Sequence, residues 1–208
     1  MFYNYLLNKY GQNNPIFISD LTYKKMTTNS IRQQIMNYVA SGKLKRYATG
    51  IYYIPGNTIF KSGSLLSPSI VIEKKYLSAG KNQFGYTSGL NFANEIGITT
   101  QVPMSYEVVT NKASKDYREI KLASSKIIIK KPRLKVTKSN YKKLQLLDLF
   151  KDIDLYVELN KKNLWSKIKA YMEKAEIKFS DLEPFLPLYP DKTYRNMYMI
   201  GVLGGVST

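Results

Sequence analysis

Apolar and polar positions in the first forty residues indicate three separate helices. An apolar run over residues 2–10 predicts a short helix that Gly11 ends. Ser19 or Asp20 is suited to cap a second helix, which we expect to continue to Met26. The pattern therefore predicts two short helices before residue 27.

The third predicted helix has the clearest pattern. It follows a capping run at residues 27–29 and ends at Gly42, because glycine favours the left-handed conformation that closes a helix. Four apolar side chains recur at i, i+4, i+7 and i+8 and share one buried stripe: Ile31, Ile35, Tyr38 and Val39. The opposite face is polar and carries Asn29, Ser30, Gln33 and Asn37, with Arg32 at its flank.

Two runs with strand character follow this helix, at residues 43–47 and 51–54. The Ala-Thr-Gly between them suits a three-residue hairpin loop with glycine at the bulge. Three helices and then a basic hairpin is the order of a winged helix-turn-helix. In that arrangement the start of the third helix enters the major groove, and the hairpin lies over the phosphate backbone.

The side chains on these elements suit contact with double-stranded DNA. Asn and Gln pair with adenine edges and Arg with guanine, while Lys43, Lys45 and Arg46 suit phosphates. Two other interpretations stay open. The polar face of a small helical domain is often only solvated, and winged helices also serve as docking modules for proteins.

The second half of the chain mixes helices and strands. We expect helices from Pro68 onward, at about 87–96, and then at 141–150, 162–175, 180–186 and 192–203, with strands at 106–110, 119–122, 126–130 and 133–136. The strands resemble a small antiparallel sheet. The sequence thus predicts an α+β fold: a winged helix-turn-helix domain over 1–57, a Gly/Ser/Pro-rich linker over 58–67 and a mixed α+β carboxy-terminal interaction domain over 68–208. Tyr189, Tyr194 and Tyr198 could lie in its core or form a contact surface, and the core is the preferred interpretation.

Charge adds a partner class to this fold. The 208 residues contain 32 Lys or Arg and 15 Asp or Glu, which gives a net charge of +17. Nucleic acid is the commonest partner of such a basic chain, although a Lys-rich proteome would raise the charge as well. Residues 1–57 contain seven Lys or Arg but a single acid, Asp20. The basic character is therefore concentrated where the pattern predicts the DNA-binding domain.

The chain has no cysteine and no histidine. This excludes disulfides, zinc sites built from these residues and catalysis through an imidazole base. Residues 1–11 lack the pattern of a secretion signal, and the longest apolar stretch, 197–206, is too short to span a bilayer. We expect a cytoplasmic protein with no membrane contact, no cofactor and no bound metal.

Carboxylates are the remaining route to catalysis. Asp152 and Asp154 form a D-x-D, but the Gly63-Ser64 pair that a nucleotidyl transferase needs nearby lies about 90 residues away. Glu73 begins an E-x-K of the form found in nucleases, yet it lies in a predicted helix. Asp148 and Asp152 share a helix face at i, i+4. We predict no enzyme, and a magnesium-dependent nuclease stays as an alternative.

Three segments resemble those of known families. Residues 41–55 (SGKLKRYATGIYYIP) resemble the wing of the AbiEi-type antitoxins of type IV toxin-antitoxin systems. Residues 86–91 (YTSGLN) and 97–103 (GITTQVP) follow as they do in the related family DUF6088. The resemblance covers about residues 19–135.

This resemblance implies a two-domain antitoxin that represses its own transcription in an abortive-infection system. The winged helix would bind repeats in its own promoter. The second domain would oppose a separately encoded nucleotidyl transferase toxin, with or without a stable complex. The implied DNA-binding residues are Thr28, Asn29, Ser30, Arg32 and Gln33 on the helix and Lys43, Lys45, Arg46 and Thr49 on the hairpin. The alternative is a protein-interaction or inhibitor module without specific DNA binding.

Overall fold

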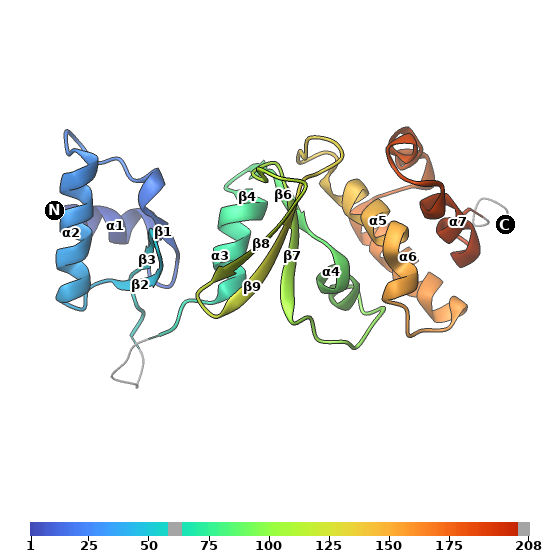
Figure 1. The fold of residues 1–208 in the computed structure, drawn as a ribbon, viewed down its shortest axis with the longest axis horizontal. Helices are drawn as coiled ribbons and strands as arrows, with labels where there is room; N and C mark the ends of the chain where they lie inside the picture. The colour runs from blue at the N-terminus through green and yellow to red at the C-terminus, as the bar shows by residue number, and fades with distance from the viewer. Residues whose placement is uncertain (58–63, 204–208) are drawn as a thin grey trace. The chain divides into compact units, whose positions relative to one another are not determined.

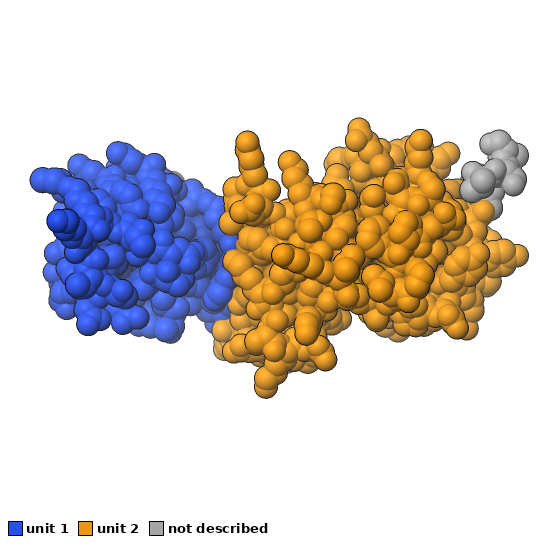
Figure 2. Space-filling view, turned by 90° about the horizontal axis from the view of Figure 1, so that it is seen from above, with its two compact units in different colours: residues 1–75, 122–124 blue, residues 76–121, 125–208 orange. Residues whose placement is uncertain are grey.

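The computed structural model describes residues 1–57 and 64–203 (Figure 1). The chain is a mixed α+β protein, about 46% helical and 18% strand. It divides into two compact units, which Figure 2 colours separately: unit 1 is residues 1–75 with 122–124, and unit 2 is residues 76–121 with 125–208. Of the predicted linker over 58–67, residues 58–63 lie outside the described part of the chain, and 64–67 belong to unit 1.

Unit 1 combines helices with a small sheet. Its elements are α1 (Phe2–Tyr10), β1 (Ile16–Phe17), the 3-10 turn η1 (Ile18–Asp20), α2 (Thr28–Ala40), β2 (Lys45–Ala48), β3 (Ile51–Tyr53) and α3 (Pro68–Ile72). The predicted first helix is confirmed over residues 2–10. The third predicted helix is also confirmed: the Thr27 hydroxyl accepts from the Ser30 amide at 3.2 Å, and Ile31 and Ile35 are buried. Local capping and periodicity were therefore sufficient to predict both helices.

The predicted second helix is wrong. Only Ile18–Asp20 forms a single 3-10 turn, and the chain leaves it at Leu21 in an extended conformation. Lys24 then adopts the left-handed region, which ends any helical path. The Tyr23 ring packs instead against Phe2 and Tyr5, with ring centroids 5.0 and 4.8 Å apart. Aromatic packing onto α1 holds this segment where helical hydrogen bonds were expected.

The sheet of unit 1 has the strand order β1-β3-β2. The predicted hairpin of β2 and β3 is confirmed as antiparallel, but the predicted three-residue loop with glycine at the bulge is wrong. Ala48 pairs with Ile51 as the last residue of β2, and the register shift lies earlier, between Arg46 and Ala48. β1 adds a third strand that the sequence pattern did not predict, pairing Ile16 with Tyr52. The core beneath it is built from α1, α2 and the strands, and includes Leu6, Ile16, Ile31, Ile35, Leu44, Tyr52 and Ile54.

Unit 2 is a sheet covered by helices. Its strands are β4 (Ser78–Ala79), β5 (Asn82–Gln83), β6 (Gly85–Thr87), β7 (Ser105–Thr110), β8 (Tyr117–Leu122) and β9 (Ser125–Lys130). Its helices are α4 (Gly89–Glu95), α5 (Tyr141–Asp152), α6 (Lys161–Ala175) and α7 (Asp191–Ile200), with short helical turns η2 (Glu73–Leu77, shared with unit 1), η3 (Ile153–Leu155), η4 (Phe179–Asp181) and η5 (Glu183–Leu188).

The main sheet has the order β6-β7-β9-β8 and is mixed, not antiparallel as predicted. β6 runs antiparallel to β7, whereas β9 runs parallel to β7 and pairs Val108 with Ile129. Residues 133–136 form no strand, contrary to the prediction. A parallel neighbour is set by contacts between distant segments, which strand propensity does not encode.

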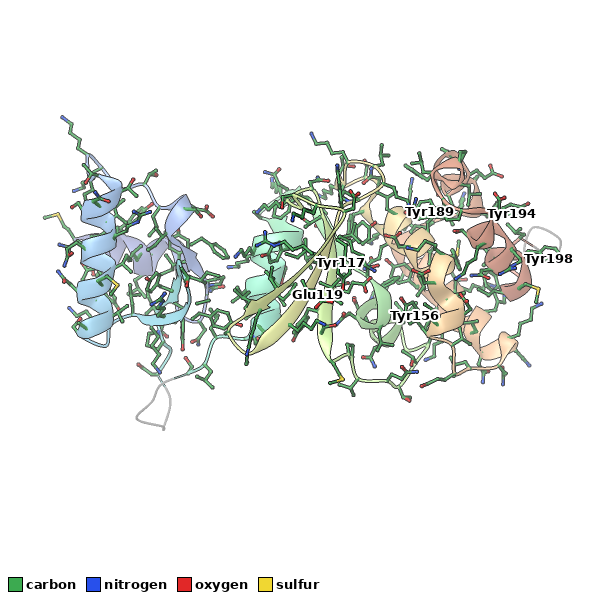
Figure 3. All side chains as sticks on the ribbon, in the orientation of Figure 1. Tyr117, Glu119, Tyr156, Tyr189, Tyr194 and Tyr198 are labelled. Atoms are coloured by element: carbon green, nitrogen blue, oxygen red, sulfur yellow. The ribbon has the colours of Figure 1, made fainter. Side chains whose placement is uncertain are left out.

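Helices α4 and α5 contact β7 and β6, and α7 contacts both α5 and α6 (Figure 1). The resulting core is the largest in the chain and includes Phe92, Ile98, Leu144, Leu147, Phe150, Ile168, Leu182 and Met197. Tyr189 is buried in it, as expected. Tyr194 and Tyr198 are not: they are 53% and 68% exposed on α7, so the core prediction is wrong for both (Figure 3). Among the described residues no helix is long and apolar enough to cross a membrane.

Candidate nucleic-acid interface

The nine side chains proposed to bind DNA lie at the surface of unit 1. Lys45 is half-buried and the other eight are exposed. Exposure follows from the helical pattern, since Ile31 and Ile35 turn one side of α2 into the core and leave the opposite side in solvent. All nine are therefore accessible to a large ligand within unit 1.

The outer face of α2 presents polar amides. The Gln33 amide donates to the Asn37 carboxamide oxygen at 3.3 Å, one helical turn further on. This contact fixes the Gln33 side chain and leaves its own oxygen and the Asn37 amide nitrogen free of that bond. Asn29 and Met36 share this exposed face. Such a surface offers both hydrogen-bond partners and an apolar contact to base edges.

A hollow of about 460 Å³ lies beside the first turns of α2. It brings together Thr28 and Arg32 of the helix and Thr49 of the hairpin turn, and its wall also includes Ser19, Thr22, Gly50 and Lys75. The hairpin turn is held there because the Gly50 carbonyl accepts from the Ile18 amide at 3.0 Å. Arg46 reaches the same turn and donates to the Thr49 hydroxyl at 3.2 Å. Four of the predicted residues thus meet at one end of α2.

Lys43 lies at the other end of the helix. It follows the carboxy terminus of α2, and its ammonium lies 5.6 Å from the centre of the Tyr3 ring on α1. Thirteen helical residues separate it from the Thr28 end, or about 20 Å along the axis. The predicted set is therefore divided between two ends of α2 and does not form a single cluster.

The cations of this surface are not neutralised by carboxylates. Within the described part of residues 1–57, no Lys or Arg forms an ion pair. Asp20 is exposed and accepts from the Ser19 hydroxyl at 2.8 Å. The hydrogen bond to the Tyr5 hydroxyl raises the pKa of Lys9, so that ammonium stays charged. The surface keeps its full positive charge for an external anion.

Sequence reasoning missed two contributors to this unit. Lys75 lines the hollow although it lies beyond the segment expected to bind DNA. Two lysines also form cation–π contacts with tyrosine rings: the Lys9 ammonium lies over Tyr5 of α1, and the Lys24 ammonium over Tyr23 before α2. The i, i+4 spacing of Tyr5 and Lys9 was a signal for the first of these pairs.

Two of the carboxylates considered for catalysis form ion pairs with the same lysine. Asp152 and Asp154 both pair with Lys192, at 3.9 and 3.1 Å. Gly63 of the Gly63-Ser64 pair lies outside the described residues, and Glu73 lies in a helical turn. No group of three or more acidic side chains that could hold a metal ion occurs among the described residues.

The YTSGLN run places polar groups inside unit 2. Tyr86 donates to the Asp148 carboxylate at 2.7 Å, and burial raises the pKa of Asp148 although this hydrogen bond lowers it. Gly89 has φ +59°, and a Cβ there would lie 2.7 Å from the Glu107 carboxylate. Glu107 also pairs with Lys130 at 2.7 Å. The run therefore fixes the contact between the sheet and helices α4 and α5.

Fold and surface together define a mixed α+β protein whose amino-terminal unit is poor in acid. The chain belongs to DUF6088, a family of unknown function whose model matches residues 6–178. The match extends beyond both ends of the resemblance, which covered about residues 19–135. It supports membership of DUF6088 and gives no evidence for the AbiEi-type antitoxins. No curated protein matches the chain, and no solved structure does.

Proposed function

We propose that unit 1 is a winged helix-turn-helix that binds double-stranded DNA and that the protein regulates transcription. The observation that carries this proposal is the hollow at the start of α2, where Thr28, Arg32 and Thr49 meet. Among the described residues, no Lys or Arg of the segment 1–57 forms an ion pair there. The element order α1-β1-η1-α2-β2-β3, with β1 beside β3, supports the assignment. In this assignment the second helix is reduced to η1.

The two elements have different tasks in this proposal. Helix α2 enters the major groove, where Asn29, Arg32 and Gln33 read base edges. The hairpin lies along the backbone, where Lys45 and Arg46 contact phosphates. Thr28 and Thr49 contact the phosphate between them, while Lys43 contacts the backbone at the far end of α2.

A regulator of this kind is tested by binding to the DNA upstream of its own gene. We expect Arg32→Ala or Gln33→Ala to relax base preference, because each removes a side chain that reads a base. Lys45→Ala or Arg46→Ala should weaken all duplexes alike and lower the salt slope by about one each. Lys169→Ala, a matched loss of charge on α6 in unit 2, should change nothing. Fluorescence anisotropy with cognate and scrambled duplexes, from low to physiological salt, measures both effects.

Absence of salt-dependent duplex binding at low salt would refute the proposal. Equal losses in Lys169→Ala and Arg46→Ala would refute the assigned surface, because net charge alone would then explain binding.

The resemblance of residues 41–55 to the AbiEi wing supports a further role as an antitoxin. In this role the protein represses its own promoter and opposes a nucleotidyl transferase toxin encoded beside it. One feature of unit 2 favours a protein partner: α7 exposes Tyr194, Tyr198 and Met199, the last 62% accessible, next to Arg195. Exposed Tyr and Arg are enriched where proteins bind one another.

Coexpression tests this role. The protein should restore growth to cells that express the neighbouring reading frame, and Tyr194→Ala/Tyr198→Ala should abolish protection if α7 contacts the toxin directly. Arg46→Ala should leave protection intact, because it affects the DNA surface. A neighbouring product that is harmless alone contradicts the antitoxin role and leaves the DNA-binding proposal standing.

A further inference from the structure

A second hollow lies in unit 2 and shares no residue with the proposed DNA surface. Its volume is about 530 Å³, and it is lined by the end of α4, the first turn of α5 and one face of α6. Figure 1 shows these three helices grouped on the same side of the sheet. The volume falls within the range of about 300–1,000 Å³ that small-molecule sites occupy.

The hollow exists because the face of α6 that lines it has a small side chain between two long ones. Lys167, Ala170, Tyr171 and Lys174 recur at i, i+3, i+4 and i+7 and share one stripe that faces the hollow. Ala170 leaves the space open between the two lysines. Tyr171 forms a fixed aromatic wall: its hydroxyl donates to the Gln145 carboxamide oxygen at 3.1 Å, and its ring packs edge-on against Phe92.

Gln145 is itself immobilised. It is 7% exposed, and its amide donates to the Thr87 carbonyl at 2.9 Å. Burial raises the pKa of Tyr171, with a further rise from the nearby Glu95 carboxylate, so the hydroxyl stays protonated and keeps this bond. The wall is therefore organised before any ligand arrives.

Charge in the hollow is unbalanced. Three lysines line it, Lys142, Lys167 and Lys174, against one carboxylate, Glu95. None of these three lysines forms an ion pair within the described residues. Lys169, which lies on α6 outside the hollow, does pair, with its ammonium 4.0 Å from the Glu173 carboxylate. The Lys167 ammonium is directed toward Gly97, where an added Cβ would meet it at 3.6 Å. An anion is the ligand that satisfies these groups.

We propose that this hollow binds a nucleoside triphosphate, with its phosphates on the lysines and its base or ribose against Tyr141 and Tyr171. Lys167 and Lys174 are two turns apart, about 10 Å along the axis, a distance that suits a chain of phosphates better than one phosphate ion. The two tyrosines supply aromatic surface on which a base stacks. The site belongs to unit 2 and is independent of DNA binding by unit 1.

The test is a calorimetric titration of the full chain with ATP, GTP, CTP and UTP, with pyrophosphate and adenosine as partial probes, at about 150 mM salt. We expect saturable binding of at least one triphosphate, weaker binding of pyrophosphate and the weakest binding of adenosine. Lys167→Gln/Lys174→Gln should weaken binding about a hundredfold, since each lysine contributes a charge-assisted hydrogen bond of about tenfold. Lys169→Gln should bind as the unaltered protein does.

Two further variants separate this site from other basic surfaces. Ala170→Phe fills an exposed position in the hollow and should abolish binding without unfolding α6, which circular dichroism checks. Lys45→Gln/Arg46→Gln in unit 1 should leave triphosphate binding unchanged. The proposal is overturned by the absence of saturable binding, by wild-type affinity in folded Ala170→Phe, or by equal affinity for pyrophosphate and every triphosphate.

Discussion

Replacing Tyr86 with phenylalanine should destabilise unit 2 through the carboxylate of Asp148. The variant removes the hydroxyl that donates to Asp148 at 2.7 Å and leaves the ring, which is 2% exposed, in place. A hydrogen bond to a charged group contributes about 1.5–3 kcal/mol, so we expect a loss of about 2 kcal/mol at pH 7. That is a large share of the roughly 5–15 kcal/mol that stabilises a domain.

The loss should depend on pH with a definite sign. Burial already holds the pKa of Asp148 above its usual 3.8, so this carboxyl takes up a proton at a higher pH in the folded state than in the unfolded chain. Loss of the Tyr86 hydroxyl raises this pKa further, because that hydrogen bond stabilises the ionised form. The deficit relative to the unaltered protein should therefore be largest at neutral pH and should shrink as the pH falls toward the usual value.

Urea denaturation monitored by the fluorescence of Trp165, the single tryptophan of the chain, measures unit 2 directly. Tyr106→Phe is the matched control, since the Tyr106 hydroxyl lies on the same sheet and makes no hydrogen bond within the described residues. A deficit that is unchanged between pH 7 and pH 4, or an equal loss in Tyr106→Phe, would refute the reasoning.

Three further changes test other contacts. Hydrogen bonds, the largest effect coming from the Thr100 backbone amide, lower the pKa of Glu158 from an ordinary 4.5 to about 2. The stability that this contact contributes should therefore be lost as the pH falls from 4.5 to about 2. Glu158→Gln should remove that part of the pH dependence of the urea midpoint. Thr27→Ala should cost about 1 kcal/mol in the denaturation of unit 1, because the Ser30 amide loses its cap. Gly89→Ala should lower the midpoint of unit 2 more than Gly80→Ala, since both have positive φ but only the first meets the Glu107 carboxylate. These assignments are contradicted if Glu158→Gln keeps the full pH dependence, if Thr27→Ala unfolds at the same urea midpoint as the unaltered protein, or if Gly89→Ala and Gly80→Ala have equal midpoints.

Local signals predicted the parts of unit 1 that local contacts determine. Helix α2 and the hairpin carry their caps, periodicity and turn residues within a few positions, and both are confirmed. The segment from Ser19 to Met26 begins with a suitable cap as well, but the Tyr23 ring packs on α1 and the segment forms only a single 3-10 turn. Propensity alone did not include that competing contact.

Distant contacts account for most of what the sequence did not reveal. The parallel pairing of β7 with β9 and the addition of β1 to its sheet join separated segments. For the candidate interface, exposure and the separation of Lys43 from Thr28 followed from the predicted helix, whereas the approach of Thr49 to Thr28 and the place of Lys75 in the hollow depend on tertiary structure. Tyr194 and Tyr198 were expected inside because aromatic residues usually are, yet α7 buries its other face.

The close approach of Gly89 to the Glu107 carboxylate constrains which residues can occupy three positions during evolution. A side chain larger than hydrogen at 89 displaces the carboxylate at 107, and Lys130 then loses its counter-ion. Substitutions that persist at these sites should thus appear jointly: relatives that replace the glycine should also shorten the acid and exchange the lysine for an uncharged residue. Positions 89, 107 and 130 are expected to covary as a trio.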